Sequence, residues 1–339
     1  MKPIVCLTPN PALDVSTAVA ELVDQHKMRC DPGIEQPGGG GINVARVIHR
    51  LGGDAIALYP AGGPYGERLS DLLDAERVPR QTVPITAPTR FSFIVRDKAG
   101  RRQYRFVLPG PTISDHEGTR LLAQFDRLVS EGTIAVGSGS LPPGLPEDFY
   151  GRAARIAARR HARFVLDTSG AALAAALREG VYLVKPSLRE LETVAGRALG
   201  SAEEAVAFSR ELVARRAAEI VVVSLGADGA VLVTERTCRH HPAVQVAVGG
   251  TVGAGDSLVG GMLTAIARGW SVEDAFGYGM AAAGATLLAP GTALCDRATT
   301  DRLYASLAGS RPLDGQLRDA RPKANSEASA ETLGRSPES

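Results

Sequence analysis

The chain has 339 residues, of which 44% are hydrophobic and 22% are charged, and its formal net charge at pH 7 is +1. This length and hydrophobic content suit one large α/β domain or two small ones. The near-zero net charge gives no electrostatic reason to expect nucleic acid or an anionic membrane as a partner. No segment approaches the ~20 apolar residues of a membrane span, the first residues lack the long apolar region of a signal peptide, and the cysteines are widely spaced. We therefore expect a cytoplasmic protein with reduced thiols.

Short apolar runs that end in polar or glycine residues recur along the chain, and Ala- and Arg-rich stretches such as 148–160 and 202–218 lie between them as predicted helices. This alternation predicts an α/β fold with a doubly wound, mainly parallel sheet and helices on both of its faces. The polar residues would then gather beyond the carboxyl ends of the strands, where ligands of such sheets bind. The apolar runs, each given with the polar or glycine residues that come directly after it, are 4–7 with Thr8, 134–136 with 137–140, 164–166 with Asp167, 182–184 with Lys185, and 220–223 with Ser224.

Four consecutive glycines, 38–41, precede a predicted helix that carries apolar residues up to Leu51. Glycines allow a backbone to approach a ligand closely, and the side chain of Asn43 at the helix start can both donate and accept hydrogen bonds. This combination suits a sugar.

Residues 90–108 have a different pattern. The segments 91–95 and 103–107 flank the turn-like residues 97–100, which predicts a β-hairpin. Together with residues 15–37 the hairpin is expected to form a small sheet that projects from the main domain. An ordinary hairpin packed on the core is the alternative, and apolar residues on both faces would favour burial against a second chain.

The segment 249–261 is the most informative part of the chain. Gly253, Ala254 and Gly255 precede apolar residues at helical spacing, so they lead into a helix whose first N–H groups are free to bind phosphate. Asp256 at this helix start is either an N-cap or a base that accepts a proton from an attacking hydroxyl. The second interpretation predicts a kinase, with the three amides holding the developing phosphoryl charge.

These segments resemble the ribokinase-type (phosphofructokinase B) family of carbohydrate kinases, and the resemblance extends from Leu7 to about Tyr304. The matching segments are 8–14, 27–30, 37–53, 103–106, 139–144, 184–186, 224–226, 249–261 and 291–292. Within the family, residues 27–29, 60–63 and 291–295 most resemble the bacterial members that act on fructose 6-phosphate. The resemblance implies a ribokinase-like fold, residues 1–308 as one kinase domain, and a small β-sheet lid built from residues 15–37 and 88–108. The remaining residues, 309–339, carry no aromatic side chain and are predicted to be a disordered tail.

The resemblance also implies which residues bind the acceptor sugar phosphate. Asp14 matches the family's sugar-binding aspartate, although an aspartate that orders the Asn10 loop is the alternative. Arg90 would hold the acceptor's phosphate unless it is an ordinary solvated arginine. The other expected contacts are Gly39, Asn43, Ser140, Lys27 and Arg29.

ATP is expected to lie across Lys185, Ser187, Ser224, Gly226 and Gly229. The family's Asn-x-x-Glu motif stands here as 187–190, so Glu190 would organise Mg²⁺ through water while Ser187 replaces the amide and weakens metal use. Gly250 replaces an aspartate common in the family. The resemblance further implies that backbone carbonyls of Gly250, Val252 and Gly291 hold K⁺.

The implied activity is ATP-dependent phosphoryl transfer to the 1-hydroxyl of fructose 6-phosphate, giving fructose 1,6-bisphosphate in glycolysis, by a homodimer joined through the lid. Action on fructose 1-phosphate or tagatose 6-phosphate is the nearest alternative, because the relatives share Asp14, Asn43, Arg90 and Asp256. A sensor of sugar phosphate or nucleotide that has lost turnover through Ser187 is an alternative of another class.

Overall fold

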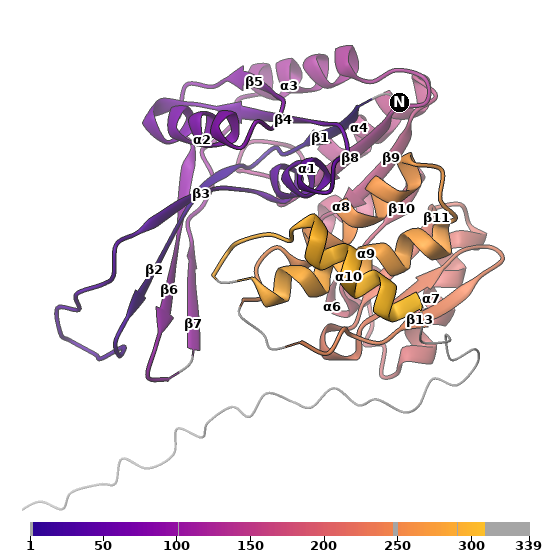
Figure 1. Cartoon of the computed structure of the whole chain (residues 1–339). Helices are drawn as coiled ribbons and strands as arrows, with labels where there is room; N and C mark the ends of the chain where they lie inside the picture. The colour runs from indigo at the N-terminus through magenta and orange to yellow at the C-terminus, as the bar shows by residue number, and fades with distance from the viewer. Residues whose placement is uncertain (1–2, 101, 247–249, 290, 309–339) are drawn as a thin grey trace, which may run out of the picture.

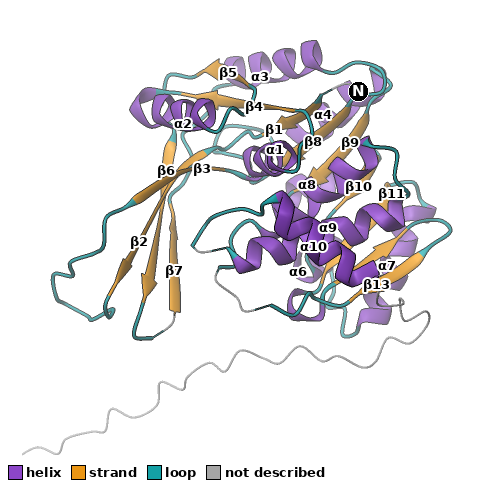
Figure 2. Ribbon diagram, in the orientation of Figure 1, coloured by secondary structure: helices purple, strands orange, loops and turns teal. Residues whose placement is uncertain are grey.

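The computed structural model describes residues 3–100, 102–246, 250–289 and 291–308, and within them the strands form two sheets (Figures 1 and 2). In spatial order the nine-stranded sheet consists of β13 (Cys238–His241), β12 (Ala230–Val233), β11 (Ala218–Ser224), β10 (Val181–Val184), β9 (Arg163–Asp167), β8 (Ile134–Ser138), β1 (Ile4–Leu7), β4 (Ala55–Ala61) and β5 (Arg80–Pro84). The four-stranded sheet consists of β3 (Ile34–Gly38), β2 (Ala12–Val19), β6 (Arg90–Asp97) and β7 (Arg102–Val107). The tail predicted at 309–339 lies outside the described residues.

Helices connect and cover the strands. They are α1 (Gly40–Arg50), α2 (Gly63–Ala75), α3 (Asp115–Leu128), α4 (Phe149–Arg159), α5 (Gly170–Leu177), α6 (Leu188–Ala195), α7 (Ala202–Ala214), the 3₁₀ helix η1 (Gly226–Asp228), α8 (Ala254–Ala267), α9 (Val272–Leu288) and α10 (Arg297–Ala308). No helix in these described ranges is long and apolar enough to cross a membrane.

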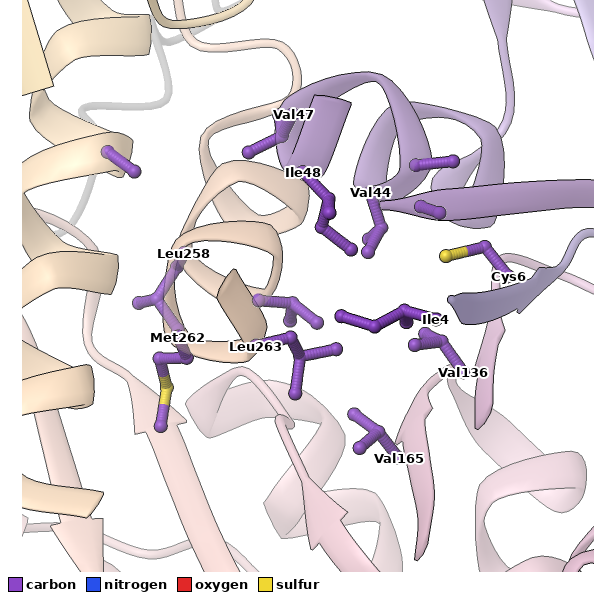
Figure 3. Packing of buried hydrophobic residues seen from close by; sticks show 14 of the residues in the cluster. Ile4, Cys6, Val44, Val47, Ile48, Val136, Val165, Leu258, Met262 and Leu263 are labelled. Atoms are coloured by element: carbon purple, nitrogen blue, oxygen red, sulfur yellow. The ribbon is translucent and has the colours of Figure 1, made fainter. Parts of the chain in front are cut away.

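Alternate residues of each strand enter two separate cores, because successive side chains of a strand point to opposite faces. Ile4 and Cys6 belong to one core with side chains of α1, α8 and α9 (Figure 3). Val5 and Leu7 belong to the other core with side chains of α3, α4, α5 and α7. The expected α/β sheet with helices on both faces is therefore confirmed.

The order of the strands reverses beside β1, which pairs in parallel with β4 on one side and with β8 on the other. From β8 to β11 each strand is again parallel to its neighbour, whereas β12 and β13 each pair antiparallel. In such sheets the crevice beyond the carboxyl ends of the strands at the reversal point is the usual ligand site. The segments that follow β1, β8, β9, β10 and β11 all lie at this edge.

The small sheet projects away from the large one (Figure 1). Its β6–β7 hairpin is antiparallel as predicted, and β6 pairs with β2 in parallel. Cross-strand partners share a face, so Asp14 lies on the same face as Ser92, Gln36 and Val107. Phe106, opposite Phe93, lies on the other face.

One predicted helix is too long. The stretch 202–218 was expected to be helical throughout, whereas α7 ends at Ala214. Arg216 has a left-handed backbone with φ of 60°, and Ala218 already begins β11. A non-glycine residue in the left-handed region ends a helix, and the alanine-rich composition of this segment did not indicate it.

Candidate active site

Helix α8 presents free backbone donors at the carboxyl edge of the large sheet. Gly253 precedes the helix with a left-handed φ of 80°, which glycine adopts without strain. The first α-helical hydrogen bond runs from the Ser257 N–H to the Gly253 carbonyl at 2.8 Å. The N–H groups of residues 254–256 therefore precede the hydrogen-bonded part of the helix and can bind an anion.

Asp256 lies in the first turn of α8 and accepts a hydrogen bond from the side-chain amide of Asn43 in α1, with Nδ2 and Oδ2 2.9 Å apart. This contact follows from how closely the two helices approach. A side chain at Gly260, one turn after Asp256, would collide with Val47, one turn after Asn43. The absence of a side chain at Gly260 thus brings the two glycine-rich segments of the sequence together.

Burial raises the pKa of Asp256 to about 6, and the negative charge of Asp167 acts in the same direction. The Asn43 hydrogen bond and the positive charge of Lys185 oppose the rise. A carboxyl group with this pKa is largely ionised at pH 7 and accepts a proton more readily than an ordinary aspartate.

Lys185 follows β10 and is nearly buried, with Nζ 3.1 Å from Oδ1 of Asp167 at the end of β9. Burial alone would lower the pKa of Lys185, but the Asp167 carboxylate outweighs it and raises the value, so the amine stays charged. A Cβ at Gly255 would lie 3.5 Å from Nζ, which places this cation beside the start of α8. From the sequence we expect Asp167 at the carboxyl edge of the large sheet, as the structure shows, but the sequence indicates no function for it.

Asp14 is buried near the base of the small sheet, on β2. Burial raises the pKa of this carboxyl group, while the positive charges of Arg105 and Arg90 oppose the rise. A Cβ at Gly38 would collide with the Asp14 carboxylate, and Gly39 has a φ of 112°. The glycines therefore permit the backbone to pass directly beside Asp14.

Arg90, Asn10 and Ser140 meet at the reversal point of the large sheet. Arg90 donates from Nη2 to the Asn10 carbonyl and from Nη1 to the Leu108 carbonyl, both at 3.1 Å, and its buried Nε has no partner among the residues that the structure describes. Asn10 donates from Nδ2 to Oγ of Ser140 at 3.2 Å. Because the Ser140 hydroxyl accepts this bond, its own proton remains available to a ligand.

Ser187 and Glu190 form a capping box at the start of α6. Ser187 N–H donates to Oε2 of Glu190 at 2.7 Å, and Glu190 N–H donates to the Ser187 hydroxyl at 3.3 Å. Beside it, Ser187 and Ser224 form an isolated β-bridge. A side chain at Gly229 would collide with the His241 backbone, whereas Gly226 faces open space with a φ of 64°.

Of the remaining expected residues, Gly250 and Gly291 lie side by side, whereas Lys27 and Arg29 lie away from the site. A Cβ at Gly250 would collide with the Gly291 carbonyl, so the two segments of the expected K⁺ loop adjoin. Val252 lies two residues after Gly250 and precedes α8. Lys27 and Arg29 lie in the exposed loop between β2 and β3 at the far end of the small sheet, away from Asp14 and Arg90 (Figure 1). Within one chain they do not join the site.

Comparison with known proteins shows to which class of enzymes the chain is similar. The family model of the pfkB family carbohydrate kinases matches residues 12–299. The ATP-dependent 6-phosphofructokinase isozyme 2 of Mycobacterium tuberculosis is 43% identical over 301 residues, which cover 89% of this chain and 88% of that protein. The 1-phosphofructokinase of Bacillus subtilis is 36% identical over 283 residues, covering 84% and 92%.

Two solved structures of phosphofructokinase-2 from Escherichia coli share the fold. The complex with fructose-6-phosphate is 39% identical with a TM-score of 0.86, and the complex with potassium is 40% identical with a TM-score of 0.88. Each comparison covers 91% of this chain and 100% of the other. The chain belongs to the pfkB family of carbohydrate kinases, and its ribokinase-like α/β fold with a small second sheet is the one predicted.

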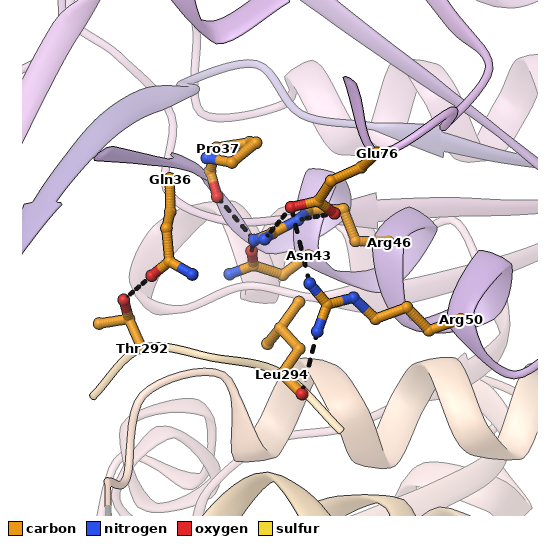
Figure 4. A network of polar contacts seen from close by, with 8 residues as sticks. All are labelled: Gln36, Pro37, Asn43, Arg46, Arg50, Glu76, Thr292 and Leu294. Atoms are coloured by element: carbon orange, nitrogen blue, oxygen red, sulfur yellow. Dashed lines mark hydrogen bonds and ion pairs between the residues drawn. The ribbon is translucent and has the colours of Figure 1, made fainter. Parts of the chain in front are cut away.

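Sequence reasoning missed the residues that surround the expected ones. Arg46 of α1 is buried and donates to both oxygens of Glu76, to the Pro37 carbonyl and to Oδ1 of Asn43 (Figure 4). An arginine three residues after Asn43 lies on the same side of the helix, which was the available signal. The partner Glu76, directly after α2, has no signal in the sequence because its position depends on tertiary packing.

Proposed function

We propose that this chain is an ATP-dependent 6-phosphofructokinase that transfers the γ-phosphoryl group of ATP to the 1-hydroxyl of fructose 6-phosphate, giving fructose 1,6-bisphosphate, a step of glycolysis. The observation that carries the proposal is the Asp256 carboxylate, 2.9 Å from the Asn43 amide and beside the free N–H groups of α8. Phosphoryl transfer needs a proton acceptor and an anion hole next to each other. The relatives and solved structures of 6-phosphofructokinases support the choice of acceptor.

In this mechanism Asp256 accepts the proton of the acceptor hydroxyl as the oxygen attacks phosphorus. The amides of Gly253, Ala254 and Gly255 hold the charge of the transferred group, and the Lys185 ammonium adds positive charge at the same end of α8. Nucleotide binding is assigned to Lys185, Ser187, Ser224, Gly226 and Gly229 around this edge. Proton acceptance and anion stabilisation thus fall to separate groups.

The acceptor sugar phosphate is held by residues other than those that bind ATP. Asp14 accepts hydrogen bonds from sugar hydroxyls, with Gly39 and Asn43 beside it, while Arg90 and Ser140 bind the 6-phosphate. The buried Nε of Arg90, which has no partner among the described residues, and the free proton of Ser140 support this assignment. Lys27 and Arg29 remain candidate phosphate contacts only if the loop of one chain reaches the site of another.

Mg²⁺ bound with ATP would neutralise phosphate charge. Within the described ranges no group of three or more His, Cys, Asp or Glu side chains converges to hold a metal, which fits a cation held mainly by phosphate oxygens and water. One carboxylate oxygen of Glu190 takes no part in the capping-box bond. We assign Glu190 as the side chain that organises Mg²⁺ through water. Backbone carbonyls of Gly250, Val252 and Gly291 are the assigned K⁺ ligands, and the adjoining Gly250 and Gly291 backbones support this.

We further propose a cytoplasmic homodimer joined through the small sheet. The exposed apolar residues Ile34 and Val107 lie on the face that carries Asp14, and Phe106 lies on the opposite face. Exposed apolar surface on both faces of a sheet fits burial against a second copy.

The experiment that tests the function is a coupled ADP-release assay with Mg²⁺ and a panel of fructose 6-phosphate, fructose 1-phosphate, tagatose 6-phosphate and fructose. We expect the highest kcat/KM for fructose 6-phosphate. A preference for fructose 1-phosphate would favour the activity named for the Bacillus subtilis relative. The absence of ADP release with every sugar would favour the sensor.

A further inference from the structure

Arg46, in the second turn of α1, links the Asn43 side chain to the partly exposed carboxylate of Glu76. Its side chain is 1% exposed, and it donates from Nε and Nη2 to the two carboxylate oxygens of Glu76 at 2.8 and 2.5 Å. From Nη1 it also donates to the Pro37 carbonyl at 2.9 Å and to Oδ1 of Asn43 at 3.3 Å (Figure 4). Two parallel bonds to one carboxylate fix the plane of the guanidinium group. Arg46 therefore presents a fixed donor to Asn43.

This donor determines which way the Asn43 amide points. A guanidinium group can only donate, so the Asn43 atom that faces Arg46 is the oxygen. The amide nitrogen then faces Asp256, as the 2.9 Å contact requires of an ionised carboxylate, which can only accept. Donor-only and acceptor-only groups at the two ends hold the amide in one orientation.

We infer that Arg46 is a positioning residue that keeps the Asp256 carboxylate ionised by holding the Asn43 amide nitrogen against it. The inference rests on the proposed function insofar as Asp256 acts as the proton acceptor. In the absence of Arg46 the amide is free to turn its oxygen toward Asp256. An oxygen in that position favours the protonated carboxyl group, which cannot accept a proton from the sugar.

The charged groups around Asp256 are Asp167 on β9, Lys185 directly after β10 and Arg105 on β7. None of them contacts Arg46 directly in the hydrogen bonds of the described residues, so a change at Arg46 reaches Asp256 through Asn43. Arg50 provides a matched control. It lies one turn after Arg46, also faces Glu76 at 3.6 Å, and donates to the Leu294 carbonyl rather than to Asn43.

The test is the pH dependence of kcat/KM for fructose 6-phosphate in Arg46→Met/Glu76→Gln. Both charges are removed together because the loss of one partner alone would leave the other charge buried and destabilise the fold. We expect the acidic limb of the profile to move upward by about one pH unit, as the loss of a hydrogen bond to a charged group predicts. The control Arg50→Met, which retains the bonds from Arg46 to Glu76 and to Asn43, should keep the wild-type limb.

A second readout does not depend on turnover. The Asp256 carboxyl carbon can be titrated by NMR in protein labelled with ¹³C-aspartate and assigned by its loss in Asp256→Asn. If the titration moves but wild type has no activity, the proposed function fails and the role of Arg46 stands. Arg46→Lys, which keeps the charge but loses the two-pronged donor, is the second variant and should move the titration less. Lowered thermal stability with an unchanged titration and acidic limb in these variants would make Arg46 merely structural and overturn the inference.

Discussion

At the scale of single residues, the most informative property is the pKa of Asp256. Burial and Asp167 raise it from 3.8 to about 6. Asp256 accepts a proton only in its ionised form, so activity should be present above pH 6 and fall as the pH drops through this value. An aspartate with an ordinary pKa would give a limb near pH 4. The measurement is kcat/KM from pH 4.5 to 8, and an acidic limb below pH 5 would contradict the assignment.

Arg90 gives a second prediction at this scale. In the proposed function the Nε of Arg90 binds the acceptor's phosphate, so Arg90→Ala should raise KM for fructose 6-phosphate by roughly 10- to 100-fold, as expected for a hydrogen bond to a charged group. Activity on unphosphorylated fructose should change little. Arg90 also bonds the Asn10 and Leu108 carbonyls, so the melting temperature is the control. Equal losses for the two acceptors would mark Arg90 as a structural residue.

At the scale of elements, the start of α6 allows metal binding to be separated from helix stability. Asparagine is as good an N-cap as serine, and glutamine can replace glutamate in a capping box. Ser187→Asn and Glu190→Gln should therefore both keep the melting temperature close to that of wild type. Ser187→Asn should lower the Mg²⁺ concentration for half-maximal rate, and Glu190→Gln should raise it by removing the charge.

The same measurements of rate against Mg²⁺ concentration distinguish a metal-binding role of Ser187 and Glu190 from a purely structural one. If both variants keep the wild-type Mg²⁺ dependence, Ser187 and Glu190 serve only as a cap and the metal assignment is withdrawn. If wild type releases no ADP but Ser187→Asn does, the protein is the sensor rather than the kinase.

The glycine-rich helix starts show which features of the site the sequence predicts and which it does not. The glycines at 38–41 and at 253 and 255 predicted two backbone approaches at helix starts, because glycine alone lacks the Cβ that would block such an approach. The contact between Asn43 and Asp256 could not be predicted from local pattern, since it spans 213 residues and depends on Gly260 meeting Val47. The Ser-x-x-Glu pattern of a capping box was readable at Ser187 but was interpreted only through metal binding.

At the scale of the whole molecule, the small sheet is the element through which we propose that two chains associate. The sequence predicted its hairpin from alternation and turn residues, but the position of the Lys27 loop relative to the site depends on the direction in which the sheet projects. No local pattern encodes that direction. The exposed side chains of Ile34 and Phe106 lie on opposite faces of the sheet.

Charges at these two positions should separate the subunits whichever face they share. Burial of one large apolar side chain stabilises by ~1.5–3 kcal/mol, so Ile34→Asp/Phe106→Asp should weaken a dimer by on the order of 10²-fold or more. Ile34→Val/Phe106→Leu keeps both side chains apolar and should leave the dimer intact. Sedimentation equilibrium measures both. Wild type that sediments as a monomer, or an unaffected dimer in the aspartate variant, would contradict assembly through the small sheet.

The central claim is that Asp256 accepts the proton while ATP phosphorylates the 1-hydroxyl of fructose 6-phosphate. Its most direct test follows the reaction of fructose 6-phosphate, ATP and Mg²⁺ by ³¹P NMR in wild type and in Asp256→Asn. We predict that wild type forms fructose 1,6-bisphosphate and ADP in equal amounts. Asp256→Asn should be slower by on the order of 10²-fold or more while binding fructose 6-phosphate within a few-fold of wild type by calorimetry. No fructose 1,6-bisphosphate from wild type, or a near-normal rate in Asp256→Asn, would contradict it.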